Sequence, residues 1–145
     1  MAKDFFSPEE QKRIVESIQK AEKDTSGEVR VHIENRCKTT VLERATKVFK
    51  ILSMDKTAQR NGVLFYLAVK DHKFAILGDK GINDKVPSDF WESIKNHMQA
   101  LFKEGKFTDG LSDGILMAGE QLGKHFPYQD NDINELPDDI TFGNN

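Results

Sequence analysis

The sequence has few of the features that mark specialised protein classes. A single cysteine, Cys37, among 145 residues excludes an internal disulfide and fits a reducing compartment. No apolar run is long enough to cross a bilayer, and the first residues lack the apolar core of a signal peptide. Lys and Arg number 21 against 24 Asp and Glu, so no positive excess favours nucleic acid. We therefore expect one soluble, cytoplasmic domain with no membrane span and no nucleic-acid partner.

The region from Arg60 to Asp84 contains the one long apolar run in the sequence and ends in a polar, glycine-rich loop. Residues 63–69 carry no charge and are mainly β-branched, aromatic or aliphatic, which predicts a strand covered on both faces. A polar break at 71–72 and a second apolar run at 74–77 predict an antiparallel hairpin. The hairpin is expected to belong to the core, and the loop GDKGIND to carry the site.

Helical periodicity and capping residues predict the remaining elements. Ser7-Pro8-Glu9-Glu10 and Thr40-Val41-Leu42-Glu43 have the pattern of capping boxes, and Thr108 or Asp109 can cap the last helix. Alternation at 29–33 predicts a short, peripheral strand with one wetter face. The expected elements are helices over 8–23, 41–52, 88–102 and 109–126, and strands over 29–33, 63–69 and 74–77.

This order, αβαββαα, predicts an α/β fold: a three-layer α/β/α sandwich with a small mixed sheet. Because a strand, helix, strand crossover places its strands parallel, the first two strands should run the same way and the third should return against them. We expect a single domain over residues 1–127 and an acidic C-terminal tail over residues 128–145. The tail has five carboxylates and no Lys or Arg, but also four apolar residues, so docking as an edge strand and a solvated tail both stay open.

The predicted strand directions bring oxygen-bearing side chains to one end of the sheet. Glu28 begins the first strand, Arg60 and Asn61 precede the second, and Asp79 follows the third, with Asp84 in the next loop. Converging carboxylates repel each other unless a cation or Arg60 neutralises them, and hard oxygen ligands suit Ca²⁺ or Mg²⁺. The hypothesis is a divalent-cation site of Glu28, Asp79 and Asp84 with Asn61 in support.

Two other interpretations of the acidic residues stay open. The glycines and Asn61 are also typical of turns at strand ends, with the acids on a solvated surface. A rival site lies at the opposite end of the sheet, where Asp109 and Asp71 also have ordinary capping and turn roles. The residues of this rival site are Glu34, Asn35, Asp71, His72, Asp109 and Asp113.

Signatures of other sites fail on inspection. Cys37 to Arg44 is one residue too long for a phosphatase loop and lacks glycine, which favours a buried thiol. The four histidines lie on separate elements without zinc-site spacing, so each is expected on the surface. Asp130-Asn131-Asp132-Ile133-Asn134 imitates the start of an EF-hand loop, but Glu135 stands where that loop needs glycine. No phosphate-binding loop, dinucleotide-binding motif or nucleophile elbow is present.

Four short motifs together resemble the TPM domain family, whose members include thylakoid-lumen proteins of photosystem repair and many bacterial proteins. The motifs are Thr25-Ser26-Gly27-Glu28-Val29, Arg60-Asn61-Gly62-Val63-Leu64, Gly78-Asp79-Lys80-Gly81-Ile82 and Phe102-Lys103-Glu104-Gly105-Lys106-Phe107. The motifs follow the family's order, and the resemblance runs from about Ser7 to Pro127, without the signal peptide or membrane helix of several members. The resemblance implies an α/β/α sandwich, a divalent-cation site that favours Ca²⁺ over Mg²⁺, and the acid phosphatase activity attributed to a plant member.

The residues and the resemblance together predict a cation-binding module with a regulatory or protein-interaction role. A weak, metal-assisted acid phosphatase is the first alternative, in which Arg60 or Lys80 helps to neutralise a phosphate. A purely structural domain that binds an unknown protein partner is the second.

Overall fold

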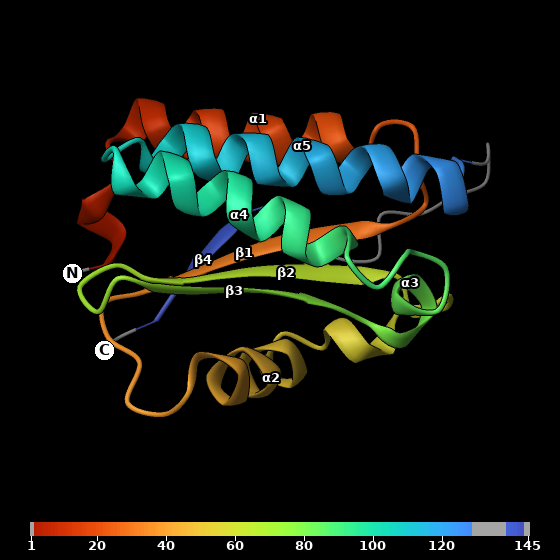
Figure 1. The fold of residues 1–145 in the computed structure, drawn as a ribbon, viewed down its shortest axis with the longest axis horizontal. Coiled ribbons are helices and arrows are strands. Elements are labelled where there is room, and N and C mark those ends of the chain that lie inside the picture. The colour runs from red at the N-terminus through yellow and green to blue at the C-terminus, as the bar shows by residue number, and fades with distance from the viewer. Residues whose placement is uncertain (1, 129–138, 144–145) are drawn as a thin grey trace.

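A mixed sheet with strand order β3-β2-β1-β4 forms the middle layer of the protein (Figure 1). The structure is a computed structural model, and it describes residues 2–128 and 139–143. β1 (Glu28–Glu34) runs parallel to β2 (Gly62–Ala68) and to β4 (Ile140–Phe142), whereas β3 (Lys73–Gly78) runs antiparallel to β2. The parallel crossover and the hairpin expected from the sequence are therefore confirmed.

Helices cover both faces of this sheet (Figure 1). One face carries α1 (Pro8–Glu22), α4 (Phe90–Lys103) and α5 (Phe107–His125), and the other carries α2 (Val41–Ile51). The short helix α3 (Lys80–Asn83) and the 3₁₀ segments η1 (Ala2–Phe5) and η2 (Met54–Lys56) complete the described elements. The three-layer α/β/α sandwich predicted from the sequence is confirmed. No helix among the described residues has the length and apolar content needed to cross a membrane.

The helix ends follow the capping prediction in part. Ser7 and Glu10 form the complete capping box of α1, and the Thr40 hydroxyl accepts from the Glu43 N–H at the start of α2. The predicted caps of the last helix are wrong, because α5 begins at Phe107, ahead of both residues. Thr108 instead donates a hydrogen bond to Glu10, so its hydroxyl joins α5 to α1.

Each face of the sheet has its own apolar cluster. Val31, Phe65 and Leu67 pack under α1, α4 and α5 as part of the larger cluster. Leu64 and Tyr66 face the opposite way and pack with residues of α2 and η2 in the smaller cluster. Because helices cover both faces of the sheet, β2 carries apolar and aromatic residues on both of its sides, as expected for a central strand.

The prediction that the first strand is peripheral with one wetter face is wrong. β1 lies between β2 and β4, and all seven of its residues are buried. Arg30, His32 and Glu34 alternate with apolar residues as predicted, but their face is covered rather than solvated. His32 is therefore a buried histidine, which corrects the expectation of a surface position.

Three residues of the acidic tail form β4. The N–H of Gly143, directly after β4, donates to the carbonyl of Ile33, which extends the ladder with β1 by one hydrogen bond. The EF-hand-like segment, residues 130–135, lies outside the described residues.

Candidate functional site

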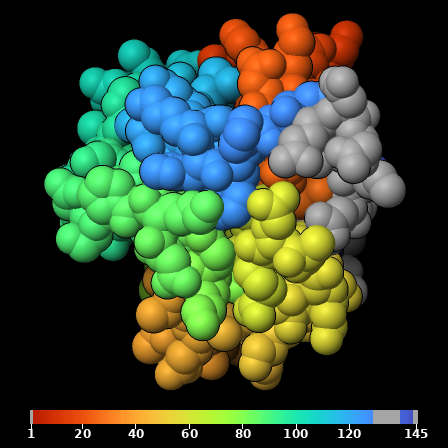
Figure 2. Space-filling view, turned by 90° about the vertical axis from the view of Figure 1, so that its right-hand side faces the viewer, coloured from red at the N-terminus to blue at the C-terminus, as the bar shows by residue number. Residues whose placement is uncertain are grey.

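The end of the sheet where β1 and β2 begin gathers three of the predicted site residues. Glu28 is the first residue of β1, Asn61 precedes β2, and Asp79 follows β3. The Glu28 N–H donates to the Asn61 carbonyl at 3.4 Å, and the Asp79 N–H donates to the Gly62 carbonyl at 2.9 Å. Backbone pairing therefore fixes the three residues beside one another; we call this group, together with Arg60, the strand-start cluster. Figure 2 shows this end, with the segment before β2 (yellow) beside the segment that contains α3 (green).

Within the strand-start cluster, Arg60 neutralises Asp79. Arg60 Nε lies 2.6 Å from Asp79 Oδ2 and its Nη2 lies 2.8 Å from Oδ1, a bidentate ion pair. The hydrogen bonds from Arg60 to Asp79 raise the pKa of the guanidinium further above its ordinary value. Asp79 Oδ1 also accepts from the Lys80 N–H as the N-cap of α3. One carboxylate thus holds both a guanidinium and the start of a helix.

The amide side chain of Asn61 is the unusual member of the cluster. It is 1% exposed, and neither its Oδ1 nor its Nδ2 has a hydrogen-bond partner within the part of the chain that the structure describes. Buried polar atoms nearly always have partners, because an unpaired one costs about 1–3 kcal/mol. Arg60, the preceding residue, has a φ of 52°, a left-handed conformation that is strained for arginine. Strain and an unsatisfied amide at adjacent positions are typical of a ligand site.

The segment after Asp79 differs from its prediction. GDKGIND was expected as a loop, but residues 80–83 form α3, and Asp84 is its exposed C-cap. α3 packs closely on the preceding chain: a Cβ added at Gly81 would lie 2.1 Å from the carbonyl oxygen of Gln59. Asp84 is thus held on α3 at the surface, while Asp79 and Asn61 are buried. No group of three or more His, Cys, Asp or Glu side chains within residues 2–128 and 139–143 is arranged to hold a metal ion.

Asp55 joins this region although the sequence analysis did not select it. Its Oδ1 is buried without a hydrogen-bond partner among the described residues, and its charge contributes to the raised pKa of Arg60. Asp55 lies in η2, which packs against β2. A lone aspartate in a short polar segment carries no sequence signal of such a role.

The rival site at the opposite end of the sheet is divided among separate ion pairs. Asp71 accepts from the Cys37 N–H at 2.7 Å and from Arg36 at 3.1 Å, while Asp109 pairs with Arg13 and Asp113 with His97. His72 is exposed in the hairpin turn, and Asn35 accepts a backbone hydrogen bond from Lys70. The structure therefore gives each acid of this group its own partner.

Glu34 instead anchors a buried polar network that the sequence analysis missed. Its carboxylate is fully buried and accepts hydrogen bonds from Arg44, from the Tyr66 hydroxyl at 2.6 Å and from His32 Nε2 at 3.1 Å. His32 Nδ1 lies 2.6 Å from the Thr141 hydroxyl, which extends the network to β4. Three elements, β1, α2 and β2, thus meet at one carboxylate, and β4 joins the network through His32.

The pKa values in this network follow from burial and pairing. Burial alone would raise the pKa of Glu34, but the hydrogen bonds from Arg44, Tyr66 and His32 outweigh it and lower the pKa to about 2. Burial lowers the pKa of His32 below its ordinary value. Burial also raises the pKa of Tyr66 above its ordinary value. At neutral pH the network therefore holds a charged Glu34–Arg44 pair beside a neutral histidine and a neutral tyrosine.

Cys37 borders the network and is buried, as the sequence predicted. Its Sγ lies 3.3 Å from the Thr39 carbonyl oxygen and donates to it. α2 begins four residues later, at Val41, and Arg44 is bound to Glu34. This thiol has neither the cradle of N–H groups nor the free arginine of a cysteine phosphatase loop.

The comparisons with known proteins agree with this architecture. The family model of the TPM domain matches residues 2–121, so the chain belongs to the TPM domain family. It is similar to the BA42 protein from the psychrophilic bacterium Bizionia argentinensis, whose NMR structure has 52% sequence identity and a TM-score of 0.90, covering 96% of each chain. The N-terminal domain of the cg2496 protein from Corynebacterium glutamicum has a TM-score of 0.57 at 12% identity, over 97% of this chain and 82% of that domain, and shares the fold alone. No curated protein matches the sequence.

Proposed function

We propose that the protein is a divalent-cation-binding module, with Ca²⁺ favoured over Mg²⁺, and that the strand-start cluster holds the ion. The observation that carries the proposal is the Asn61 amide, whose buried oxygen has no hydrogen-bond partner among the described residues. Asp79 and Glu28 supply carboxylates from the neighbouring chain segments, a donor set that suits a hard cation. Asp84, the exposed C-cap of α3, is the fourth ligand that the sequence predicts.

Arg60 defines how this cluster responds to an ion. Its guanidinium pairs with Asp79, but half of the side chain is exposed, so solvent screens the pair and Arg60 has room to move away. A bound cation would supply the positive charge that Arg60 supplies in its absence. Arg60 and the ion should therefore compete for Asp79.

A Ca²⁺ titration followed by amide chemical shifts tests this proposal. We expect the largest shifts at Glu28, Arg60–Asn61 and Asp79, and weaker binding of Mg²⁺. Asp79→Asn should reduce the Ca²⁺ affinity about tenfold, because it removes one carboxylate charge. Asp113→Asn, which changes an exposed acid paired with His97, is the matched control and should leave the affinity unchanged. Shifts confined to the acidic tail or to the hairpin turn would contradict the site.

A weak, metal-assisted acid phosphatase is the alternative, and the half-exposed Arg60 guanidinium beside Asp79 favours it. A bound divalent ion would supply a Lewis acid for phosphate, and Arg60 would bind the same anion by charge. Hydrolysis of p-nitrophenyl phosphate that is lost in Asp79→Asn but kept in Asp113→Asn would support the enzyme. Ca²⁺ binding without turnover would support the cation-binding module. The regulatory role and the cytoplasmic location proposed for this module would then be tested in cells.

A further inference from the structure

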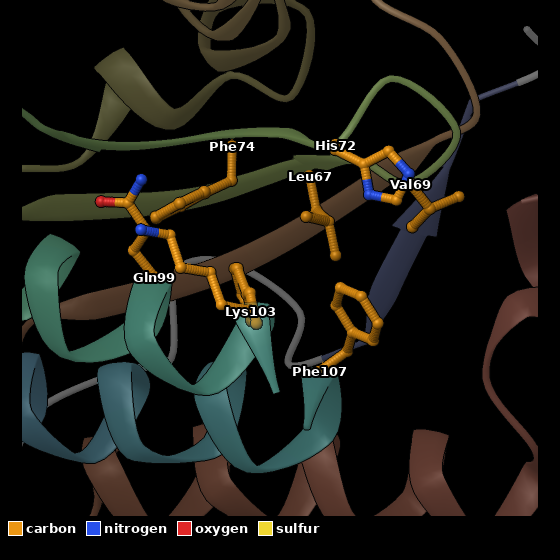
Figure 3. A pocket seen from close by; sticks show the side chains of 8 residues that line it. Leu67, Val69, His72, Phe74, Gln99, Lys103 and Phe107 are labelled. Atoms are coloured by element: carbon orange, nitrogen blue, oxygen red, sulfur yellow. The ribbon is translucent and has the colours of Figure 1, made fainter. Parts of the chain in front are cut away.

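A partly open apolar cavity of about 230 Å³ lies at the opposite end of the sheet from the strand-start cluster. Figure 3 shows residues of the β2–β3 hairpin facing residues of α4 and α5 across this space. The floor is formed by the buried side chains of Leu67 and Val69. The lining residues are Leu67, Val69, His72, Phe74, Gln99, Phe102, Lys103 and Phe107, and we call this space the hairpin cavity.

The aromatic wall of the hairpin cavity is held in place by contacts between its rings. Phe102 packs edge-to-face on Phe74, with centroids 4.9 Å apart, and stacks on Phe107 at 5.5 Å. Phe107 in turn contacts Phe5, which packs on the buried Phe6 of the N-terminal segment. Each such pair adds about 0.5–1.5 kcal/mol beyond area burial, so this wall is preorganised. The three rings that line the cavity are nevertheless only partly buried, which leaves apolar surface for a ligand to cover.

One lysine, Lys103, is among the residues that line the hairpin cavity. Lys103 has no ion pair within the described residues, and His72 and Gln99 add polar groups at the edge. The acids next to lining residues in the sequence already have partners, because Glu104 pairs with Lys106 and Asp71 binds Arg36 and the Cys37 N–H. His72 also has a φ of 53°, a left-handed conformation held by the tight hairpin turn. A lysine and three aromatic rings that line the same cavity are complementary to an anion with an apolar body.

We propose that the hairpin cavity binds a small carboxylic acid with an aromatic ring or a short acyl chain. The apolar body would lie against Phe74, Phe102 and Phe107, and the carboxylate would lie at Lys103. The volume is below the ~300–1,000 Å³ of sites for drug-sized ligands, which limits the ligand to about ten non-hydrogen atoms. The site is independent of the cation proposal, because it lies at the other end of the strands.

Amide chemical shifts in the presence of phenylacetate test this assignment. We expect saturable shifts at Leu67, Val69, His72 and Phe107, with no change at Glu28 or Asp79. The neutral isostere phenylacetamide should bind about fivefold more weakly, since it lacks the charge that meets Lys103. Equal affinities for acid and amide, or shifts elsewhere on the protein, would overturn the proposal.

Three exposed positions on α4 allow variants that leave the core intact. Lys103→Gln should weaken phenylacetate about fivefold and leave phenylacetamide unchanged, whereas the matched control Lys95→Gln, also exposed on α4, should change neither. Gln99→Trp should fill the mouth and abolish binding of both compounds. Undiminished binding to Gln99→Trp, or equal effects of the two lysine variants, would contradict the assignment.

Discussion

At the scale of single residues, Glu34 shows how a buried charge is kept stable. Its carboxylate has no exposed surface, yet its pKa is lowered to about 2 because hydrogen bonds from Arg44, Tyr66 and His32 outweigh the cost of burial. In the unfolded chain the Glu34 carboxyl has the ordinary glutamate pKa of about 4.3. The lower pKa in the folded state therefore stabilises the fold by about 3 kcal/mol at neutral pH relative to strong acid. This contribution is complete above the unfolded pKa and is lost as the pH falls toward 2.

Removing one of these hydrogen bonds should weaken both the acidity of Glu34 and the stability of the fold. Tyr66→Phe deletes the hydroxyl that donates to Glu34 at 2.6 Å and should lower the unfolding free energy by about 2 kcal/mol at pH 7. The loss should shrink as the pH falls toward 2, where folded wild-type Glu34 begins to bind its proton, and the Glu34 pKa should be higher in the variant. Urea unfolding at both pH values and carboxyl ¹³C shifts measure these effects.

The other tyrosine provides the control for this experiment. Tyr128 is half exposed, so Tyr128→Phe should leave the unfolding free energy within about 0.5 kcal/mol at either pH. An identical loss in Tyr66→Phe at pH 7 and pH 2 would show that the hydroxyl contributes packing alone.

At the scale of elements, β4 is joined to the network through one side chain. The Thr141 hydroxyl lies 2.6 Å from His32 Nδ1 and 3.3 Å from the Val31 carbonyl oxygen. Thr141→Val keeps the shape but leaves His32 Nδ1 without this partner, so local opening of β4 should become easier. We expect about tenfold faster hydrogen exchange of the Gly143 amide, which donates to Ile33, with α5 amides unchanged.

Thr46 provides a comparison for this variant, because it is exposed on α2 and its hydroxyl donates to the Leu42 carbonyl of the same helix. Thr46→Val should leave exchange of the Gly143 amide unchanged. Unchanged exchange in Thr141→Val as well would mean that the backbone ladder alone holds β4.

The short helix α3 is the second element whose placement depends on one residue. A side chain at Gly81 would meet the carbonyl oxygens of Gln59 and Arg60 at 2.1 and 2.5 Å, both backbone atoms. Gly81→Ala should therefore cost about 2 kcal/mol of stability and displace Arg60 from Asp79. Thermal unfolding and the amide shifts of Arg60 and Asp79 measure both effects.

Gly123 serves as the control for that substitution. It lies in α5, and a Cβ added there would lie 3.6 Å from the Asp24 carbonyl oxygen, an ordinary contact distance. Gly123→Ala should therefore stabilise the protein by about 0.5–1 kcal/mol through helix propensity. Equal effects of the two substitutions would mean that α3 is free to shift away from the Gln59–Arg60 backbone.

At the scale of the whole molecule, the sequence predicts the layers better than the environment of each strand. The capping box at Ser7 and the apolar run of β2 are local signals, and both led to the observed elements. The position of β1 was missed because its outer neighbour, β4, has only three residues and comes from the acidic tail. Once β4 and α2 cover β1, its polar face is buried and must find partners.

The strand-start cluster could be predicted from the sequence, whereas the polar network around Glu34 could not. Strand direction alone placed Glu28, Asn61 and Asp79 at one end of the sheet, because parallel and antiparallel pairing decides where each strand starts and stops. The network of Glu34 joins residues 10 and 32 positions apart through Arg44 and Tyr66, and no spacing rule links those positions. These residues come together only when the strands and α2 pack.

The central claim is that the strand-start cluster binds a divalent cation in place of the Arg60 guanidinium. Calorimetric titration of Arg60→Gln with Ca²⁺ tests it most directly, and the matched control is Arg36→Gln, at an exposed arginine paired with Asp71. If Arg60 and the ion compete for Asp79, Arg60→Gln should bind Ca²⁺ several-fold more tightly than the wild-type protein, and Arg36→Gln should bind it equally well. Equal or weaker Ca²⁺ binding by Arg60→Gln would contradict the claim.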